Sequence, residues 1–312
     1  ILKYDSVVSV DSNLTRAQRR AMLSDISDIS DISSYLQANR TMVYAQGKNT
    51  ATKADEKNAY MIVPREVKNL KDYITIRERG VTDELLELTD EGVIITEKYA
   101  KLLGVSVGDS IFVRLSEADA YPKEVKVTGI TENYIFNYIY MTPTLYQSLY
   151  NVSGDLNVLM LKLEDGANTS DVSSRLLQIT GINSVTMNTD EVEQLNTVIN
   201  SLYFIVIIMI IAAAILAFVV LYNLNNINIS ERRRELATLK LLGFFDNELN
   251  AYVYRENVVL TLLGTILGVF LGIGLHQFVM ITVETDMYMF GRELEPLSIA
   301  IGAVLTIIFA LA

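Results

Sequence analysis

The chain has 312 residues, of which 50% are hydrophobic and 20% charged, and its mean hydropathy is +0.28. This is too apolar for an ordinary soluble enzyme and too charged for an all-membrane bundle, so we expect a water-soluble part joined to a membrane part. The formal net charge of −11 argues against a nucleic-acid-binding protein, because neutralising phosphates requires clustered Lys and Arg. With no cysteine and 1 histidine, disulfides, thiolate catalysis and thiolate metal sites are excluded.

Residues 1–195 are predicted to form an α+β domain, because short β-rich runs alternate with short helical ones. The predicted strands are Thr41–Ala45, Ala59–Val63, Gly92–Ile95, Ser110–Leu115, Glu124–Ile130, Tyr134–Met141, Leu156–Leu163 and Ser184–Met187. The predicted helices are Glu97–Leu103, Pro143–Tyr150, Ser170–Ile179 and a longer one over Thr15–Leu36, where Leu23, Ile26, Ile29 and Ile32 recur at every third position.

Nothing in this domain indicates an active site. The sequence lacks the Gly-x-Ser-x-Gly pattern of a nucleophilic serine, and its acidic residues are spread as on a solvated surface. The residues in question are Asp83, Glu84, Glu87, Asp90 and Glu91. We therefore predict no catalytic residue, no metal site and no cofactor held by this chain.

Residues 196–312 are predicted to form a transmembrane α-helical bundle. No charged residue occurs between Glu193 and Glu231. Three stretches have the roughly 17–25 mainly apolar residues that a helix needs to cross a bilayer. They are Leu202–Tyr222, Asn257–Val283 and Pro296–Ala312. Because the chain begins at Ile1 and ends inside an apolar run, we interpret it as a fragment of a longer protein.

Charges in the short loops predict the orientation of these spans. The loop 223–256 carries 5 Lys or Arg residues, whereas the loop 284–295 carries only Arg292. Lys and Arg hold short loops on the cytoplasmic side during insertion. The loop 223–256 is therefore predicted to be cytoplasmic, and residues 1–195 and 284–295 extracytoplasmic.

One helix is predicted to run from the acidic start at Asp190 and Glu193 through the first span to Gly243. Unbroken, it would be about 80 Å long at about 1.5 Å per residue. Its end is amphipathic, with Leu236, Leu239 and Leu242 along one face. This end either lies on the membrane, held by anionic lipids, or binds a partner protein. We favour the partner, because a helix continued from a span can transmit force.

Glycine recurs along the second span at Gly264, Gly268 and Gly272, with Gly274 nearby. A helix face without side chains lets another helix approach closely, so we predict a packing face there. A substrate-lined groove is the alternative. His276, on the same helix, is predicted to form a hydrogen bond within the bundle or to lie near the outer interface, with a proton relay as the alternative.

Two parts of the sequence resemble a known family. Ile229-Ser-Glu-Arg-Arg-Arg-Glu-Leu-Ala-Thr-Leu-Lys-Leu-Leu-Gly243, followed by Glu256 and the glycine-rich span, resembles the cytoplasmic signature of FtsX-like and MacB-like ABC transporter permeases. Glu91-Gly-Val-Ile-Ile-Thr96, Lys101-Leu-Leu-Gly-Val-Ser-Val-Gly-Asp-Ser110 and Val125-Lys-Val-Thr-Gly-Ile130 resemble the extracytoplasmic core domain of the same family. The resemblance covers most of residues 90–312, and residues 1–89 match only loosely.

The resemblance implies a permease subunit, multi-pass in a bacterial plasma membrane, that couples a partner ATPase to movements of the outer domain. The chain lacks the Gly-x-x-x-x-Gly-Lys-Ser/Thr phosphate loop, so ATP would be bound by that partner. Other expected partners are a second permease copy or homologous half, and membrane lipids. By position, the residues coupled to the ATPase would be Glu231, Arg232, Arg233, Arg234, Glu235, Leu236, Leu239, Lys240 and Gly243.

The expected activity is export or extraction of a lipid, lipoprotein or peptide. The alternative is a membrane scaffold or receptor that activates an extracellular cell-wall hydrolase or senses antimicrobial peptides. The two differ in what the outer domain binds, which one acidic domain does not reveal.

Overall fold

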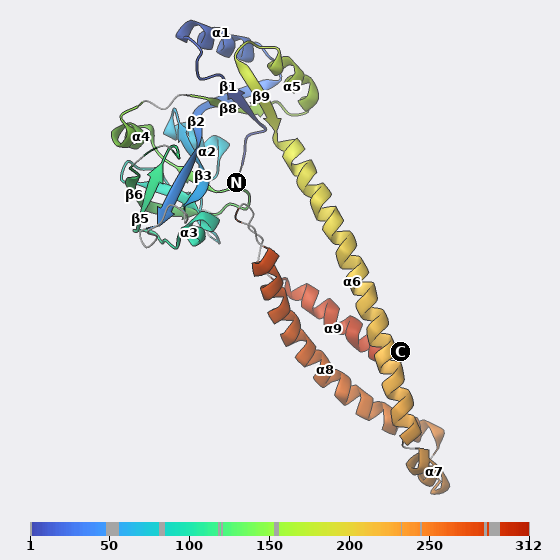
Figure 1. The fold of residues 1–312 in the computed structure, drawn as a ribbon. Coiled ribbons are helices and arrows are strands. Elements are labelled where there is room, and N and C mark those ends of the chain that lie inside the picture. Colours follow the sequence, from blue (N-terminus) through green and yellow to red (C-terminus); the bar gives the residue numbers. More distant parts are fainter. Residues whose placement is uncertain are drawn as a thin grey trace. The chain divides into compact units, whose positions relative to one another are not determined.

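The chain forms two compact units in the computed structural model, which we call the head unit and the membrane unit (Figure 1). The head unit contains residues 1–195 and 285–289, and the membrane unit contains residues 196–284 and 290–312. Contacts therefore place Asp286 with the head unit, although the sequence assigns this residue to the membrane part. The structure describes residues 2–47, 56–80, 85–117, 119, 121–152, 156–231, 233–243, 245–283, 286 and 294–311.

One mixed β-sheet organises the head unit. Its described strands follow one another in the order β3-β7-β4-β6-β5-β2-β8-β1-β9, and β3 also pairs with β2. The strands are β1 (Ser6–Val10), β2 (Ile32–Gly47), β3 (Lys57–Pro64), β4 (Val93–Thr96), β5 (Ser110–Arg114), β6 (Lys123–Thr131), β7 (Tyr138–Tyr140), β8 (Val158–Leu163) and β9 (Ile182–Met187). Every predicted strand overlaps one of these.

The long strand β2 belongs to two parts of the sheet. Its first half pairs with β8, its last residues pair with β5, and its other side pairs with β3. The β2–β3 pairing closes β2, β5, β6, β4, β7 and β3 into a ring, which leaves these strands without a free edge. One buried cluster draws side chains from all six strands, among them Met61 and Ile95, together with Tyr99. The ring therefore surrounds a core of its own.

The remaining part is a four-stranded antiparallel sheet in the order β2-β8-β1-β9. Helix α1 (Arg16–Ser27) connects β1 to β2, and α5 (Thr169–Leu177) connects β8 to β9, so two β-α-β units interleave. A second buried cluster joins α1 and α5 to the strands, with Ile26 and Leu176 fully buried. Apolar burial of this kind contributes about 25 cal/mol per Å² and holds the helices on the sheet.

Three further helices in the head unit are α2 (Val67–Tyr73), α3 (Glu97–Leu103) and α4 (Pro143–Tyr150). Helix α3 ends at Gly104, whose φ of 65° is left-handed. Helix α4 begins with proline, and the Thr142 hydroxyl accepts a hydrogen bond from the Leu145 N–H at 3.1 Å. Both helices have the predicted bounds, because their end signals are local.

The helix predicted over Thr15–Leu36 is wrong beyond Ser27, because α1 ends there and β2 begins at Ile32. Serine and aspartate are poor helix formers, and the run after Ile32 instead pairs with β8, where Leu36 lies opposite Met160. Pairing with a distant strand thus overrides the three-residue spacing. The sequence reading also missed β1 and α2.

The helices that follow are α6 (Asn188–Glu231), α7 (Arg233–Leu241), α8 (Asp246–Val283) and α9 (Pro296–Leu311). Helix α6 begins among the last residues of the head unit, where the Asn188 N–H donates to Asp5 O at 2.8 Å and its side-chain amide donates to Tyr4 O. Its 44 residues correspond to about 66 Å. Arg232 lies outside the described residues, so the predicted unbroken helix to Gly243 stays a prediction.

Among the described residues, two helical segments are long and apolar enough to cross a membrane, Tyr203–Val220 in α6 and Val258–Thr282 in α8. They match the first two predicted spans. Helix α9 occupies the third predicted span, but its 16 residues correspond to about 24 Å, less than the hydrocarbon thickness of about 30 Å. The third span therefore stays a prediction.

Candidate functional site

The segment Glu231–Gly243, which we call the coupling segment, contains the last residue of α6, all of α7 and the turn after it. Its charged side chains at Glu231, Arg233, Arg234, Glu235 and Lys240 are exposed. Arg232 and the side chain of Leu236 lie outside the described residues. The segment thus presents alternating charges on an exposed helix, a surface suited to binding another molecule.

The coupling segment ends in a defined turn. The Leu242 N–H donates to Thr238 O at 3.0 Å and to Leu239 O at 3.1 Å, and the Gly243 N–H donates to Lys240 O at 3.2 Å. Gly243 has φ +96°, the left-handed conformation that commonly ends a helix. The turn lets α8 start at Asp246, only a few residues later.

Large apolar side chains surround this turn. Leu241, Leu242 and Phe245 are 90%, 72% and 76% exposed, whereas Leu239 is partly buried. They lie well beyond the apolar segment that ends at Val220. Sequence reasoning named Leu242 but missed Leu241 and Phe245, although apolar residues on both sides of a helix-ending glycine were a usable signal. Such a cluster marks a surface that a protein or lipid covers.

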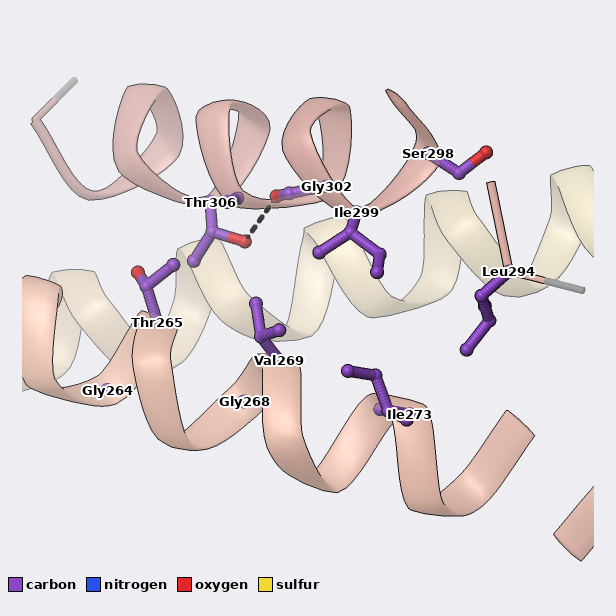
Figure 2. Close-up of a pocket in the computed structure, with 12 residues that line it drawn as sticks. Gly264, Thr265, Gly268, Val269, Ile273, Leu294, Ser298, Ile299, Gly302 and Thr306 are labelled. Atoms are coloured by element: carbon purple, nitrogen blue, oxygen red, sulfur yellow. Dashed lines mark hydrogen bonds between the residues drawn. The ribbon is translucent and has the colours of Figure 1, made fainter. Parts of the chain in front are cut away.

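Gly264, Gly268 and Gly272, which we call the glycine stripe of α8, line a groove of about 400 Å³ between α8 and α9 (Figure 2). On α9 the groove is lined by small or branched residues that the sequence reading did not connect with the stripe. The groove is lined by Leu294, which precedes α9, and by these residues of the two helices: Gly264, Thr265, Gly268, Val269, Gly272, Ile273, Ser298, Ile299, Gly302, Ala303 and Thr306.

The two threonine hydroxyls that line the groove donate hydrogen bonds within their own helices. The Thr306 hydroxyl donates to Gly302 O and the Thr265 hydroxyl donates to Thr261 O, each at 2.8 Å (Figure 2 shows the first). The groove thus makes few demands for hydrogen bonds and suits an apolar occupant. A methyl group at Gly264, Gly268 or Gly272 would meet no atom within 4 Å, so α9 does not use the close approach that glycine permits. The packing role of the stripe stays a prediction.

His276, on α8, is partly exposed, and its buried Nδ1 atom has no hydrogen-bond partner among the described residues. Neither the predicted hydrogen bond within the bundle nor the proton relay is tested by this geometry. In the part of the chain that the structure describes, no three His, Asp or Glu side chains converge as a metal site would require.

The head unit contains a second groove, of about 440 Å³, between α2 and residues 85–88. Its floor is apolar, with Leu70, Ile74 and Ile76 buried. Lys68 and Lys71, whose side chains are exposed, line the groove on the α2 side. Glu87 lines it on the side of residues 85–88. Of the predicted acidic surface, Glu87, Asp90 and Glu91 are exposed, while Asp83 and Glu84 lie outside the described residues.

Comparison with known proteins explains the combination of this head with apolar helices. The family model of the MacB-like periplasmic core domain matches residues 5–179, more than half of the chain, and that of the FtsX-like permease C-terminal matches residues 203–312. The chain is an ABC transporter permease of the MacB/FtsX type. The resemblance seen in the sequence is thereby confirmed, and it extends to the amino-terminal residues that matched only loosely.

A relative of this permease is the uncharacterized ABC transporter permease protein Rv0987 of Mycobacterium tuberculosis, 25% identical over 195 residues. The match includes 60% of this chain and only 22% of the relative. The periplasmic region of MacB from Actinobacillus actinomycetemcomitans matches with TM-score 0.36 and 13% identity, covering 63% of this chain and 94% of that one. The extracellular domain of the transporter YknZ from Gram-positive bacteria matches with TM-score 0.33 and 12% identity, covering 59% and 98%.

Proposed function

We propose that this permease passes movements of a partner ATPase through the coupling segment and α6 to the head unit, and thereby exports or extracts a lipid, lipoprotein or peptide. It acts in a bacterial plasma membrane, with the head unit outside, together with a second permease copy or homologous half. The observation that carries the proposal is the exposed apolar cluster of Leu241, Leu242 and Phe245 beside the charged α7.

The ATPase is proposed as a separate partner because the sequence lacks a phosphate loop. Burying an apolar side chain of this size contributes about 1.5–3 kcal/mol, so two or three of them anchor a partner firmly. Arg233, Arg234 and Lys240 add charge that orients the partner rather than holding it, because exposed ion pairs contribute only about 0–1 kcal/mol.

Helix α6 supports transmission because it is one continuous helix of 44 residues. Its first residues belong to the head unit, and its last residue is the first of the coupling segment. Backbone hydrogen bonds along a helix resist bending, so displacement of one end is passed to the other.

The groove beside α2 supports an amphiphilic cargo. Its volume lies within the range of about 300–1,000 Å³ typical of small-ligand sites, and its floor is apolar. Lys68 and Lys71 would favour an anionic head group. Lipid extraction and mass spectrometry of the purified wild-type permease test this class of cargo, and recovery of no amphiphile would contradict it.

Coupling is tested by changing Leu241 and Leu242 together to Asp. Two charges in place of two buried apolar contacts should weaken ATPase binding at least about 100-fold, measured as co-purification from the native membrane. The matched control is Leu177→Asp. It makes the same type of substitution at a leucine of the head unit that is 52% exposed. Undiminished co-purification with the double variant would show that this cluster is not the ATPase contact.

A further inference from the structure

Asp286, which follows α8 along the chain, belongs to the head unit by its contacts and makes two polar contacts there. The Asp286 carboxylate lies 3.1 Å from Lys57 Nζ, and the Asn137 side-chain amide donates to Asp286 O at 3.1 Å. We call Lys57, Asn58 and Asn137 the docking surface. These residues lie at the start of β3 and just before its parallel neighbour β7.

Asn137 is the buried member of the docking surface when Asp286 is docked. It is only 5% exposed, and its carbonyl accepts the Tyr60 N–H at 2.8 Å. It follows Phe136, whose φ of 60° marks a tight turn. Its Nδ2 reaches Asn58 O only at 3.5 Å, so the carbonyl of Asp286 is the better acceptor for a buried donor. A buried amide without an acceptor would destabilise the head, which favours docking.

Lys57 is fixed from the opposite side. Its carbonyl accepts the Tyr99 hydroxyl at 2.8 Å, and Tyr99 lies in the core of the ring. Burial raises the pKa of Tyr99 well above its ordinary value, so the hydroxyl keeps the proton it donates. The Lys57 side chain remains 37% exposed and points a positive charge at the docked carboxylate.

We infer that the docking surface anchors the loop between α8 and α9, so that the head is attached to the permease at a second point besides α6. Along the chain, Asp286 comes three residues after Val283, the last residue of α8. A movement of α8 is therefore passed to the head through the anchor. This role in coupling rests on the proposed function, whereas the docking itself does not.

The contacts make the anchor reversible. After the lost hydrogen bonds to water are subtracted, the hydrogen bond from Asn137 favours the docked state about five-fold. The exposed ion pair between Lys57 and Asp286 adds a factor of about two to five. Together they favour docking by roughly 10–25-fold. The buried amide provides the larger share.

Docking is tested by cross-linking in the full chain without any ATPase. The sequence has no cysteine, so Lys57→Cys with Asp286→Cys introduces the only thiols. A short bis-maleimide should link this pair at least about ten times faster than the control pair Leu177→Cys with Asp286→Cys, because α5 packs on β9 at the other end of the sheet. Equal rates for the two pairs would overturn the docking.

Coupling through the anchor is tested in the complex co-purified with its ATPase. A fluorophore on Tyr121→Cys, a site that is 84% exposed, reports nucleotide-induced change in the head. Lys57→Asp should reduce that change at least about three-fold, and adding Asp286→Lys should restore it, while Lys123→Asp, at another exposed lysine, should leave it intact.

The outcomes separate the two proposals. Loss of the nucleotide response with Lys57→Asp, while the ATPase still co-purifies, supports the anchor. An unchanged response overturns its role in coupling and leaves the proposed function standing. Failure of the ATPase to bind even the wild-type chain would contradict the proposed function, whereas the cross-linking result would still decide the docking.

Discussion

At the scale of single residues, Gly92 shows why one position tolerates no side chain. A Cβ there would lie 2.2 Å from Lys126 O and 2.8 Å from a methyl carbon of Thr128. Lys126 and Thr128 belong to β6, the parallel neighbour of β4, so the clash would fall on backbone that other strands hold in place. Gly92, the second residue of one of the family-like stretches, therefore allows β4 and β6 to pair closely within the ring.

Gly92→Ala is expected to destabilise the head unit by about 2–3 kcal/mol, because the backbone of β6 must shift. Gly129→Ala is the control in the same strand pair. Its Cβ would meet side-chain atoms of Ile94 and Leu86 at 3.3 Å, and these can yield. Its cost should stay below about 1 kcal/mol. Thermal or urea unfolding of the two variants measures the difference, and equal losses would contradict the assigned clash.

At the scale of elements, the glycine stripe of α8 differs from Gly92 because it has space around it. Gly268→Ala should leave stability in detergent within about 1 kcal/mol of the wild type, since no neighbouring atom lies within 4 Å and alanine favours helix by about 1 kcal/mol. Unfolding monitored by circular dichroism checks this. A large loss would reveal a close neighbour from a second copy or another protein, as the packing prediction requires.

How well each element could be predicted depended on where its determining contacts lie. Helices α3 and α4 carry their own end signals, Gly104 and the Thr142-Pro143 pair, and were predicted at their observed bounds. The chain after Ser27 was mistaken for helix because its pairing partner, β8, lies far along the sequence. Strand β1 and helix α2 lack a distinctive local pattern and depend on their packing.

The candidate site divides in the same way. The end of α7 near Gly243 could be predicted from the glycine, whereas the coupling role of Glu231–Gly243 stays a prediction. The exposure of Leu241 and Phe245 required knowledge of which side chains α7 and its turn leave uncovered. The α9 side of the groove and the docking of Asp286 could not be predicted either, because both bring together residues that are distant in sequence.

At the scale of the whole molecule, the proposal requires the coupling segment and the head unit to lie on opposite sides of a membrane. Single cysteines can test this because the chain has none of its own. Tyr121→Cys should react with a membrane-impermeant maleimide in intact cells, and Arg233→Cys only after permeabilisation, because the basic loop is predicted to be cytoplasmic. Labelling of both from the same side would refute the proposed topology.

The first residues of α6 determine how a force on this helix would reach the head unit. Asn188 is tied to the backbone of Tyr4 and Asp5, immediately before β1, while β9 leads directly into the helix. Strand β1 is an interior strand with β8 and β9 on its two sides. A rotation of α6 would therefore act on β1 and β9 at once. The head would turn as one body before the edge strand β9 could separate from the sheet.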